Sequence, residues 1–161
     1  MVRRNITRLR RWGRNGVSSA QADLLGDGKT DFLIEKTSGA VVVGEVSNGA
    51  TKYTQVGALG SDWKFKGVGD FLGAGQDQFM MENSAGAIVV GNVVNGQAQY
   101  SQVAALGPEW SFIGTGDYLG NGPAGFMIEN ASGAIALGTI ANGQAQFAQV
   151  SALGSEWKSH S

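Results

Sequence analysis

The chain has 161 residues and a net charge of −1, which fits one domain of ordinary size. It has no cysteine and a single histidine, His160, which excludes a disulfide framework, a cysteine nucleophile or zinc site, and a histidine-based catalytic triad. No apolar run approaches the roughly 20 residues that cross a bilayer, and an apolar share of 42% is too high for a disordered chain.

The first 22 residues form a basic arm in front of an acidic body. The arm holds all the arginines and no acid, whereas residues 23–161 hold six lysines and 13 acids. The arm could attach an accessory subunit to a larger complex, but a frayed terminus or pairing with an acidic body is the favoured interpretation. A role at nucleic acid or a membrane surface is disfavoured, and no apolar stretch follows as in a secretory signal. The candidate partner-binding residues are Arg3, Arg4, Arg8, Arg10, Arg11 and Arg14.

A repeat of 47 residues organises the rest of the chain. It is visible in Asp23, Asp70 and Asp117, and again in Trp63, Trp110 and Trp157. We therefore divide the body, 23–161, into three units at 23–69, 70–116 and 117–161.

The elements expected around the second unit are all strands and turns. Strands are predicted at 63–69, 78–83, 87–94 and 97–104, from alternation and a β-branched run. Asn95-Gly96 is a strong signal for a type I′ hairpin turn, which Asn48-Gly49 and Asn142-Gly143 repeat. No segment has sustained helical periodicity, although the arm could form a helix. The sequence thus predicts four strands per unit and an all-β fold.

Four strands in about 40–50 residues match the size of a β-propeller blade. Three units are fewer than the about four to eight blades of known propellers. A β-trefoil, which also has three repeats of four strands, is the alternative. We favour blades because of the motif that opens each unit.

The first unit opens with a loop whose oxygens could hold calcium. Asp23, Asp27 and Asp31 take loop positions 1, 5 and 9, and Gly28 at position 6 permits a sharp bend. Calcium takes about six to eight oxygen ligands. These carboxylates and the backbone carbonyl of Lys29 are therefore candidate metal ligands.

This loop and the strand after it resemble the FG-GAP/VCBS repeats, the calcium-loop repeats of integrin-type and bacterial β-propellers. The resemblance covers residues 23–161 and implies one blade per unit, an extracellular location, and a role in adhesion or carbohydrate binding. The family has Asp or Asn at loop position 3, where this chain has Leu25, Leu72 and Leu119. The later loops also lack carboxylates at positions 5 and 9, so calcium is expected at the first loop alone. The alternative is a turn whose aspartates accept backbone N–H groups.

Aromatic side chains recur at equivalent places in the units and are candidate ligand-binding residues. They are Trp63, Trp110, Trp157, Tyr53 and Tyr100. Because a flat ring can stack on the apolar face of a sugar, they would suit a lectin-like glycan site. The favoured alternative is that each tryptophan packs between neighbouring blades.

The sequence favours a non-catalytic binding or scaffold module that contacts protein or glycan. Glu35, Glu82 and Glu129 recur inside apolar strands, but equivalent positions of different blades are too far apart for paired-carboxylate catalysis, so no enzyme is expected. Three blades leave sheet faces and edges exposed, which recruit partners. We expect self-association, two copies giving six blades, or docking on a larger complex.

Overall fold

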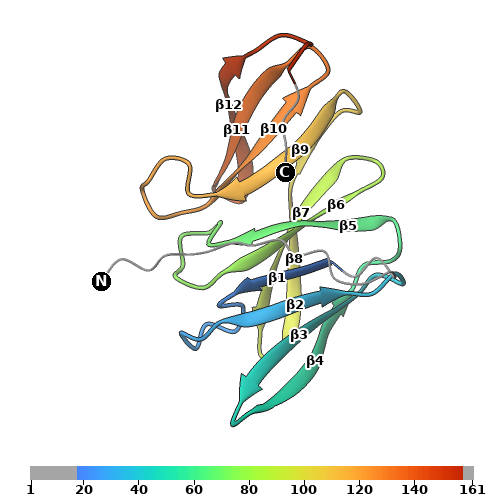
Figure 1. Cartoon of the computed structure of the whole chain (residues 1–161), viewed down its shortest axis with the longest axis vertical. Helices are drawn as coiled ribbons and strands as arrows, with labels where there is room; N and C mark the ends of the chain where they lie inside the picture. Colours follow the sequence, from blue (N-terminus) through green and yellow to red (C-terminus); the bar gives the residue numbers. More distant parts are fainter. Residues whose placement is uncertain (1–17, 158–161) are drawn as a thin grey trace.

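The computed structural model describes residues 18–157, which form strands, turns and loops without a helix (Figure 1). Accordingly, this part of the chain offers no helix that could cross a membrane. The strands are β1 (Ser18–Ala22), β2 (Asp31–Glu35), β3 (Ala40–Ser47), β4 (Ala50–Ala58), β5 (Trp63–Gly69), β6 (Gln78–Asn83), β7 (Ala87–Val94), β8 (Gln97–Ala105), β9 (Trp110–Gly116), β10 (Gly125–Asn130), β11 (Ala134–Ala141) and β12 (Gln144–Ala152). The predicted all-β class is confirmed.

The strands form three separate four-stranded antiparallel sheets, each made from one continuous stretch of chain. The first sheet has the order β1-β2-β3-β4, the second β5-β6-β7-β8 and the third β9-β10-β11-β12. Within residues 18–157 the sheets are open and do not close into a barrel. A β-trefoil needs strands from all three repeats in a common barrel, so the trefoil alternative is wrong.

Each later sheet begins at a tryptophan rather than at the aspartate that opens the sequence unit. Strand β5 begins at Trp63 and β9 at Trp110, and each is the first strand of its sheet. The sequence unit 23–69 therefore contains three strands of the first sheet followed by the first strand of the second.

Asparagine-glycine turns join the last two strands of every sheet. Asn48, Asn95 and Asn142 have φ values of 52°, 51° and 52°, and the glycine after each is also at positive φ. A type I′ turn requires this conformation at both central residues. The hairpin prediction is confirmed, and the four strands predicted around the second unit agree with β5 to β8 within one residue.

A row of phenylalanine, glycine and a second aromatic residue crosses each sheet. In the second sheet, Phe79 pairs with Gly91, which pairs with Tyr100. A Cβ at Gly91 would collide with the Phe79 ring, and Tyr100 meets that ring edge to face at 5.8 Å. The other rows are Phe32–Gly44–Tyr53 and Phe126–Gly138–Phe147. In every sheet the second aromatic residue thus packs against the phenylalanine of its own sheet.

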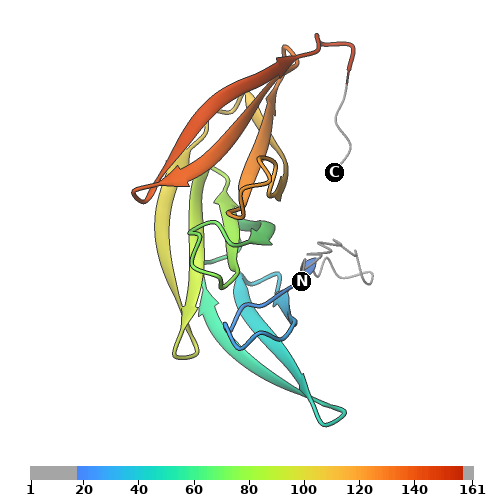
Figure 2. The same ribbon diagram turned by 90° about the vertical axis from the view of Figure 1, so that its left-hand side faces the viewer.

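Two apolar cores lie between successive sheets. Val56 and Phe79 belong to the core between the first and second sheets, and Met80 and Phe126 to the core between the second and third. Neighbouring residues such as Phe79 and Met80 face opposite cores because side chains alternate along a strand. The first strands β1, β5 and β9 contact one another in turn, as do the last strands β4, β8 and β12. The result is a curved stack of sheets (Figure 2).

Candidate functional site

The structure places the loop candidates and the aromatic candidates in different parts of the stack. The loop candidates precede and begin β2, whereas the aromatic candidates are spread over all three sheets. The partner-binding candidates Arg3, Arg4, Arg8, Arg10, Arg11 and Arg14 lie outside the described residues.

The aspartate that opens each loop holds the turn through its carboxylate. Asp23 accepts the N–H groups of Asp27 and Gly28 at 3.1 and 2.9 Å. Asp70 and Asp117 accept the corresponding N–H groups of their own loops at 2.7–3.1 Å. The later loops lack the other two carboxylates yet keep these bonds, so this aspartate stabilises the turn in all three sheets.

The other two carboxylates of the first loop have different partners. Asp31 is buried and accepts the N–H groups of Leu24 and Leu25 at 3.1 and 3.0 Å. Burial raises the pKa of Asp31. Asp27 is exposed and forms an ion pair with Lys29 at 3.1 Å, and the Lys29 N–H and ammonium lower the pKa of Asp27.

These contacts do not assemble a ready calcium site. The three aspartates are each engaged by backbone N–H groups, and Asp27 also by an ammonium. Within residues 18–157, no three acidic or histidine side chains gather as a metal ion would require. The bonds are those of the alternative turn, and calcium at the first loop stays a prediction.

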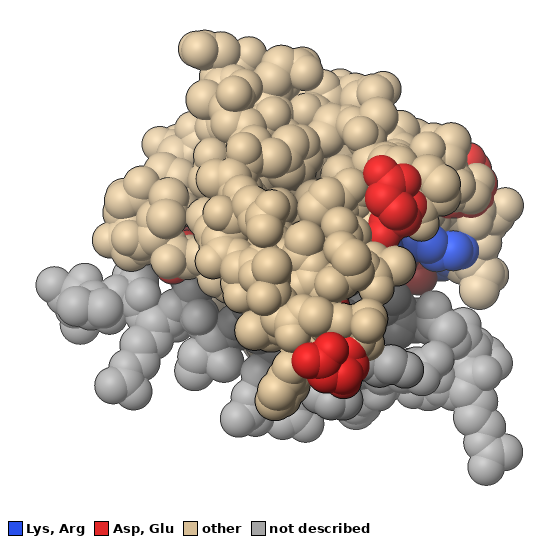
Figure 3. Space-filling view, turned by 90° about the horizontal axis from the view of Figure 1, so that it is seen from above, with Lys and Arg blue, Asp and Glu red and all other residues tan. Residues whose placement is uncertain are grey.

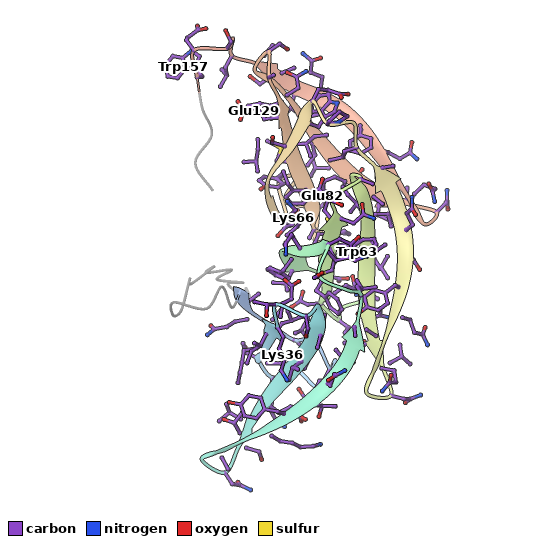
Figure 4. All side chains as sticks on the ribbon, turned by 90° about the vertical axis from the view of Figure 1, so that its right-hand side faces the viewer. Lys36, Trp63, Lys66, Glu82, Glu129 and Trp157 are labelled. Carbon is purple, nitrogen blue, oxygen red and sulfur yellow. The ribbon has the colours of Figure 1, made fainter. Side chains whose placement is uncertain are left out.

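The aromatic candidates do not share one binding site. Trp63 packs against the first core together with Tyr100, and Trp110 packs against the second core. Tyr53 is exposed on the first sheet, whereas Trp157 is exposed beyond the third, at the opposite end of the stack (Figure 4). Of the three candidate tryptophans, Trp157 alone has an exposed indole.

An open pocket of about 360 Å³ lies beside Trp157. Glu109, Glu129 and Asn130 contribute polar groups to its lining, and Pro108 and Trp157 contribute apolar surface. An aromatic ring beside carboxylate and amide groups offers both stacking and hydrogen bonding to a ligand. A glycan site beside Trp157 stays a prediction.

The outer face of the third sheet exposes apolar side chains that the other sheets bury. Val150 is 52% exposed, whereas its equivalents Val56 and Val103 are 1% and 2% exposed. Leu153 is also exposed, although its equivalent Leu106 is buried in the second core. The view from above shows a largely uncharged surface, with acidic and basic side chains confined to its right-hand and lower parts (Figure 3).

The first sheet exposes apolar side chains at the opposite end of the stack. Val46 is 60% exposed, whereas its equivalent Val93 is 5% exposed in the first core. Tyr53 is exposed, whereas its equivalent Tyr100 packs against that core. Inside the stack, one sheet contacts the next through these same positions. The third sheet therefore exposes one side of that contact, and the first sheet exposes the other.

Sequence reasoning did not single out Val46, Val150 or Leu153. Each is an ordinary apolar residue in or directly after a repeated strand, with nothing local to mark it. The available signal was the repeat itself. A position that is buried between two sheets must be exposed in the last repeat unit, because no further sheet of the chain covers it.

No protein-family model matches the chain, and no curated protein or solved structure matches it. The candidate sites therefore rest on the sequence and the geometry.

Proposed function

We propose that the chain is a non-catalytic binding and scaffold module of three β-propeller blades, which docks on protein through the outer face of its third sheet. The observation that carries this proposal is the exposure of Val150 and Leu153, where the equivalent residues of the second sheet are buried. Contiguous exposed apolar surface is typical of protein-contact sites. Stacked four-stranded antiparallel sheets, with first strands adjacent and last strands adjacent, are the arrangement expected of blades.

Two of the repeated glutamates support a non-catalytic role because they serve the fold. Glu35 Oε2 accepts the N–H of Phe65 in the next sheet at 3.1 Å, and burial raises the pKa of Glu35. Glu82 pairs with Lys66 at 2.7 Å within the second sheet (Figure 4). Neither carboxylate faces a second carboxylate, as paired-carboxylate catalysis would require.

A photo-reactive phenylalanine derivative at position 150 of the full chain tests protein docking. On illumination in cells that express the chain, we expect a covalent adduct heavier than the 16.7 kDa chain. The same group at Ala85, exposed in a turn of the second sheet, is the matched control and should give none.

The adduct must contain peptides of a protein partner and must be lost on Leu153→Asp. A chain that stays at 16.7 kDa when labelled at position 150 overturns the proposal. A chain that cross-links only within itself also stays at 16.7 kDa and therefore also overturns the proposal.

Glycan binding beside Trp157 is a second candidate function. It is favoured by the exposed indole, which borders the same pocket as Glu109 and Asn130. Wild-type chain should be retarded on a column of immobilised glycan, and Trp157→Ala should lose this retardation. Tyr53→Ala, at the opposite exposed end, is the control and should behave as wild type. Equal elution of wild type and Trp157→Ala contradicts this candidate.

A further inference from the structure

The two junctions inside the stack repeat one backbone contact between neighbouring loops. The N–H of Asp77 donates to the carbonyl of Asp23 at 3.0 Å across the first junction. The N–H of Ala124 donates to the carbonyl of Asp70 at 2.9 Å across the second. Both donors are the eighth residue of their loop and both acceptors are the first. The bond therefore belongs to the junction and not to one particular pair of residues.

Side chains follow the same register at both junctions. Gln76, the seventh residue of its loop, lies over Gly26 of the preceding loop and donates to the carbonyl of Leu24 at 2.7 Å. Pro123 takes the same place over Gly73, where an added Cβ would be 3.3 Å from the proline ring. Glycine at the fourth loop position thus makes room for the seventh residue of the next loop.

At the first junction, a small residue on the last strand also receives an aromatic side chain of the next sheet. Gly57 of β4 lies against the hydroxyl of Tyr100 in the next sheet, which leaves no space for a Cβ. The equivalent positions of the second and third sheets carry Ala104 and Ser151, which are also small. Ser151 therefore occupies the position that, at the first junction, receives the aromatic residue of the next sheet.

At each end of the stack, the groups that would form this junction face no further sheet of the same chain. The third sheet presents the carbonyl of Asp117 and the open position over Gly120, where an added Cβ would meet nothing within 4 Å. The first sheet presents the N–H of Thr30, the exposed Lys29 beside it, and the exposed Tyr53. Between residues 18 and 157, neither the Thr30 N–H nor the Asp117 carbonyl has a hydrogen-bond partner.

We propose that the third sheet of one chain docks on the first sheet of a second copy, in the register of the internal junctions. This inference rests on the proposed function and names its partner. The N–H of Thr30 donates to the carbonyl of Asp117, and Tyr53 lies on Ser151. The serine hydroxyl then offers Tyr53 the hydrogen-bond partner that the buried Tyr100 hydroxyl lacks.

The apolar residues of the two ends fit the same arrangement. Val56 and Val93 share the first core, and their equivalents at the open ends are Val150 and Val46. Head-to-tail docking brings Val150 of one copy to Val46 of the other and covers both faces. Where the rotation between docked copies closes, two copies that each use both ends form a six-sheet ring in which both of these faces are covered. A second copy is favoured over an unrelated protein because the chain already forms this junction twice.

Single cysteines at positions 53 and 151 test the register, since the wild-type chain has no cysteine. Tyr53→Cys and Ser151→Cys chains are purified, mixed and treated with a short bismaleimide. We expect a covalent dimer in the mixture and none from either variant alone, because head-to-tail docking keeps like positions apart. Ser84→Cys mixed with Ser151→Cys is the control and should give no dimer, since Ser84 is exposed in a turn between β6 and β7.

Absence of the dimer in the 53 and 151 mixture overturns the inference, and so does a dimer of Ser151→Cys with itself, which indicates face-to-face docking. If that mixture fails while position 150 still captures a different protein, this inference fails and the proposed function stands. If neither experiment gives an adduct, both are overturned.

Discussion

The N–H of Asp77 donates to the carbonyl of Asp23 at 3.0 Å, and the carboxylate of Asp77 accepts the N–H of Asp23 at the same distance. This reciprocal pair joins the loops of the first and second sheets across 54 residues of sequence. The third loop has Ala124 at the equivalent position, so the second junction keeps the backbone bond and lacks the carboxylate. Of these two loop contacts, only the one at the first junction can respond directly to pH.

Replacing Asp77 with asparagine should weaken the pH dependence of stability. Burial raises the pKa of Asp77, so the folded chain holds this proton more tightly than the unfolded chain. The contribution of Asp77 to the free energy of unfolding therefore rises as the pH falls through its folded pKa, and it is complete below the ordinary value of about 3.9. Asparagine retains an oxygen for the Asp23 N–H but does not titrate. Thermal unfolding between neutral pH and about pH 4 should show a smaller gain for Asp77→Asn than for wild type.

Asp27 provides a control of opposite sign. The Lys29 N–H and ammonium lower the pKa of Asp27, so its stabilising contribution is present above the ordinary aspartate value. It is lost as the pH falls through the lowered folded pKa. Asp27→Asn should therefore change the profile at its acid end only. Parallel profiles for wild type and Asp77→Asn at mildly acidic pH would contradict the assignment to Asp77.

Replacing Tyr100 with phenylalanine should stabilise the fold. The Tyr100 hydroxyl is buried without a hydrogen-bond partner, and an unsatisfied buried polar group costs about 1–3 kcal/mol. The edge-to-face contact with Phe79 does not need the hydroxyl. We expect the free energy of unfolding, from urea titration, to rise by about 1 kcal/mol. Tyr118→Phe, at an exposed position, should leave stability unchanged.

A double-mutant cycle tests the contact between Gly57 and Tyr100. Gly57→Ala places a methyl group against the tyrosine hydroxyl, and such overpacking costs about 1–3 kcal/mol. The loss should largely disappear in the Tyr100→Phe background, because the colliding oxygen is gone. Equal losses in both backgrounds would show that the two residues do not meet.

Replacing Asp70 with alanine should destabilise the second sheet. The Asp70 carboxylate accepts the N–H groups of Ala74 and Gly75 at 2.8 and 2.7 Å. Hydrogen bonds to charged groups contribute about 1.5–3 kcal/mol, and exposure to solvent reduces this, so a loss of about 1–2 kcal/mol in the free energy of unfolding is expected. Asp70→Asn keeps one acceptor oxygen and should lose less. Asp62→Ala, at an exposed site, should stay within about 0.5 kcal/mol of wild type.

Any calcium at the first loop should bind weakly. Leu25 supplies no side-chain oxygen, and Asp23 and Asp31 would have to exchange backbone bonds for the ion. A dissociation constant near 10⁻³ M would raise stability by about 1.4 kcal/mol at about 10 mM calcium. The rise in Tm should be absent in Asp27→Asn and absent with sodium chloride of equal ionic strength. No calcium-dependent rise in the wild-type chain would contradict the calcium prediction.

The strands and hairpins could be predicted because neighbouring residues encode them. The β-branched run of 87–94 favours an extended backbone, and Asn95-Gly96 supplies the two positive φ angles that reverse it. The 47-residue repeat then carried the prediction from one sheet to the others. These signals required no knowledge of how the sheets contact one another.

The exposed faces could not be predicted residue by residue, because exposure depends on a neighbouring sheet. Val103 and Val150 occupy the same position of matching strands, yet only Val103 has a sheet over it. The loop aspartates pose a similar problem. The same carboxylate oxygens can ligate calcium or accept backbone N–H groups. For Asp23, the sequence alone does not distinguish between these two roles.

The most direct test of the account is the solution mass of the purified full chain by light scattering after size exclusion. Complementary end faces predict a mass near twice 16.7 kDa for wild type and near 16.7 kDa for Val150→Asp. Ala85→Asp, a charge placed in an exposed turn of the second sheet, should keep the wild-type mass. A wild-type chain with a mass of 16.7 kDa, indistinguishable from Val150→Asp, would contradict head-to-tail pairing of the two ends.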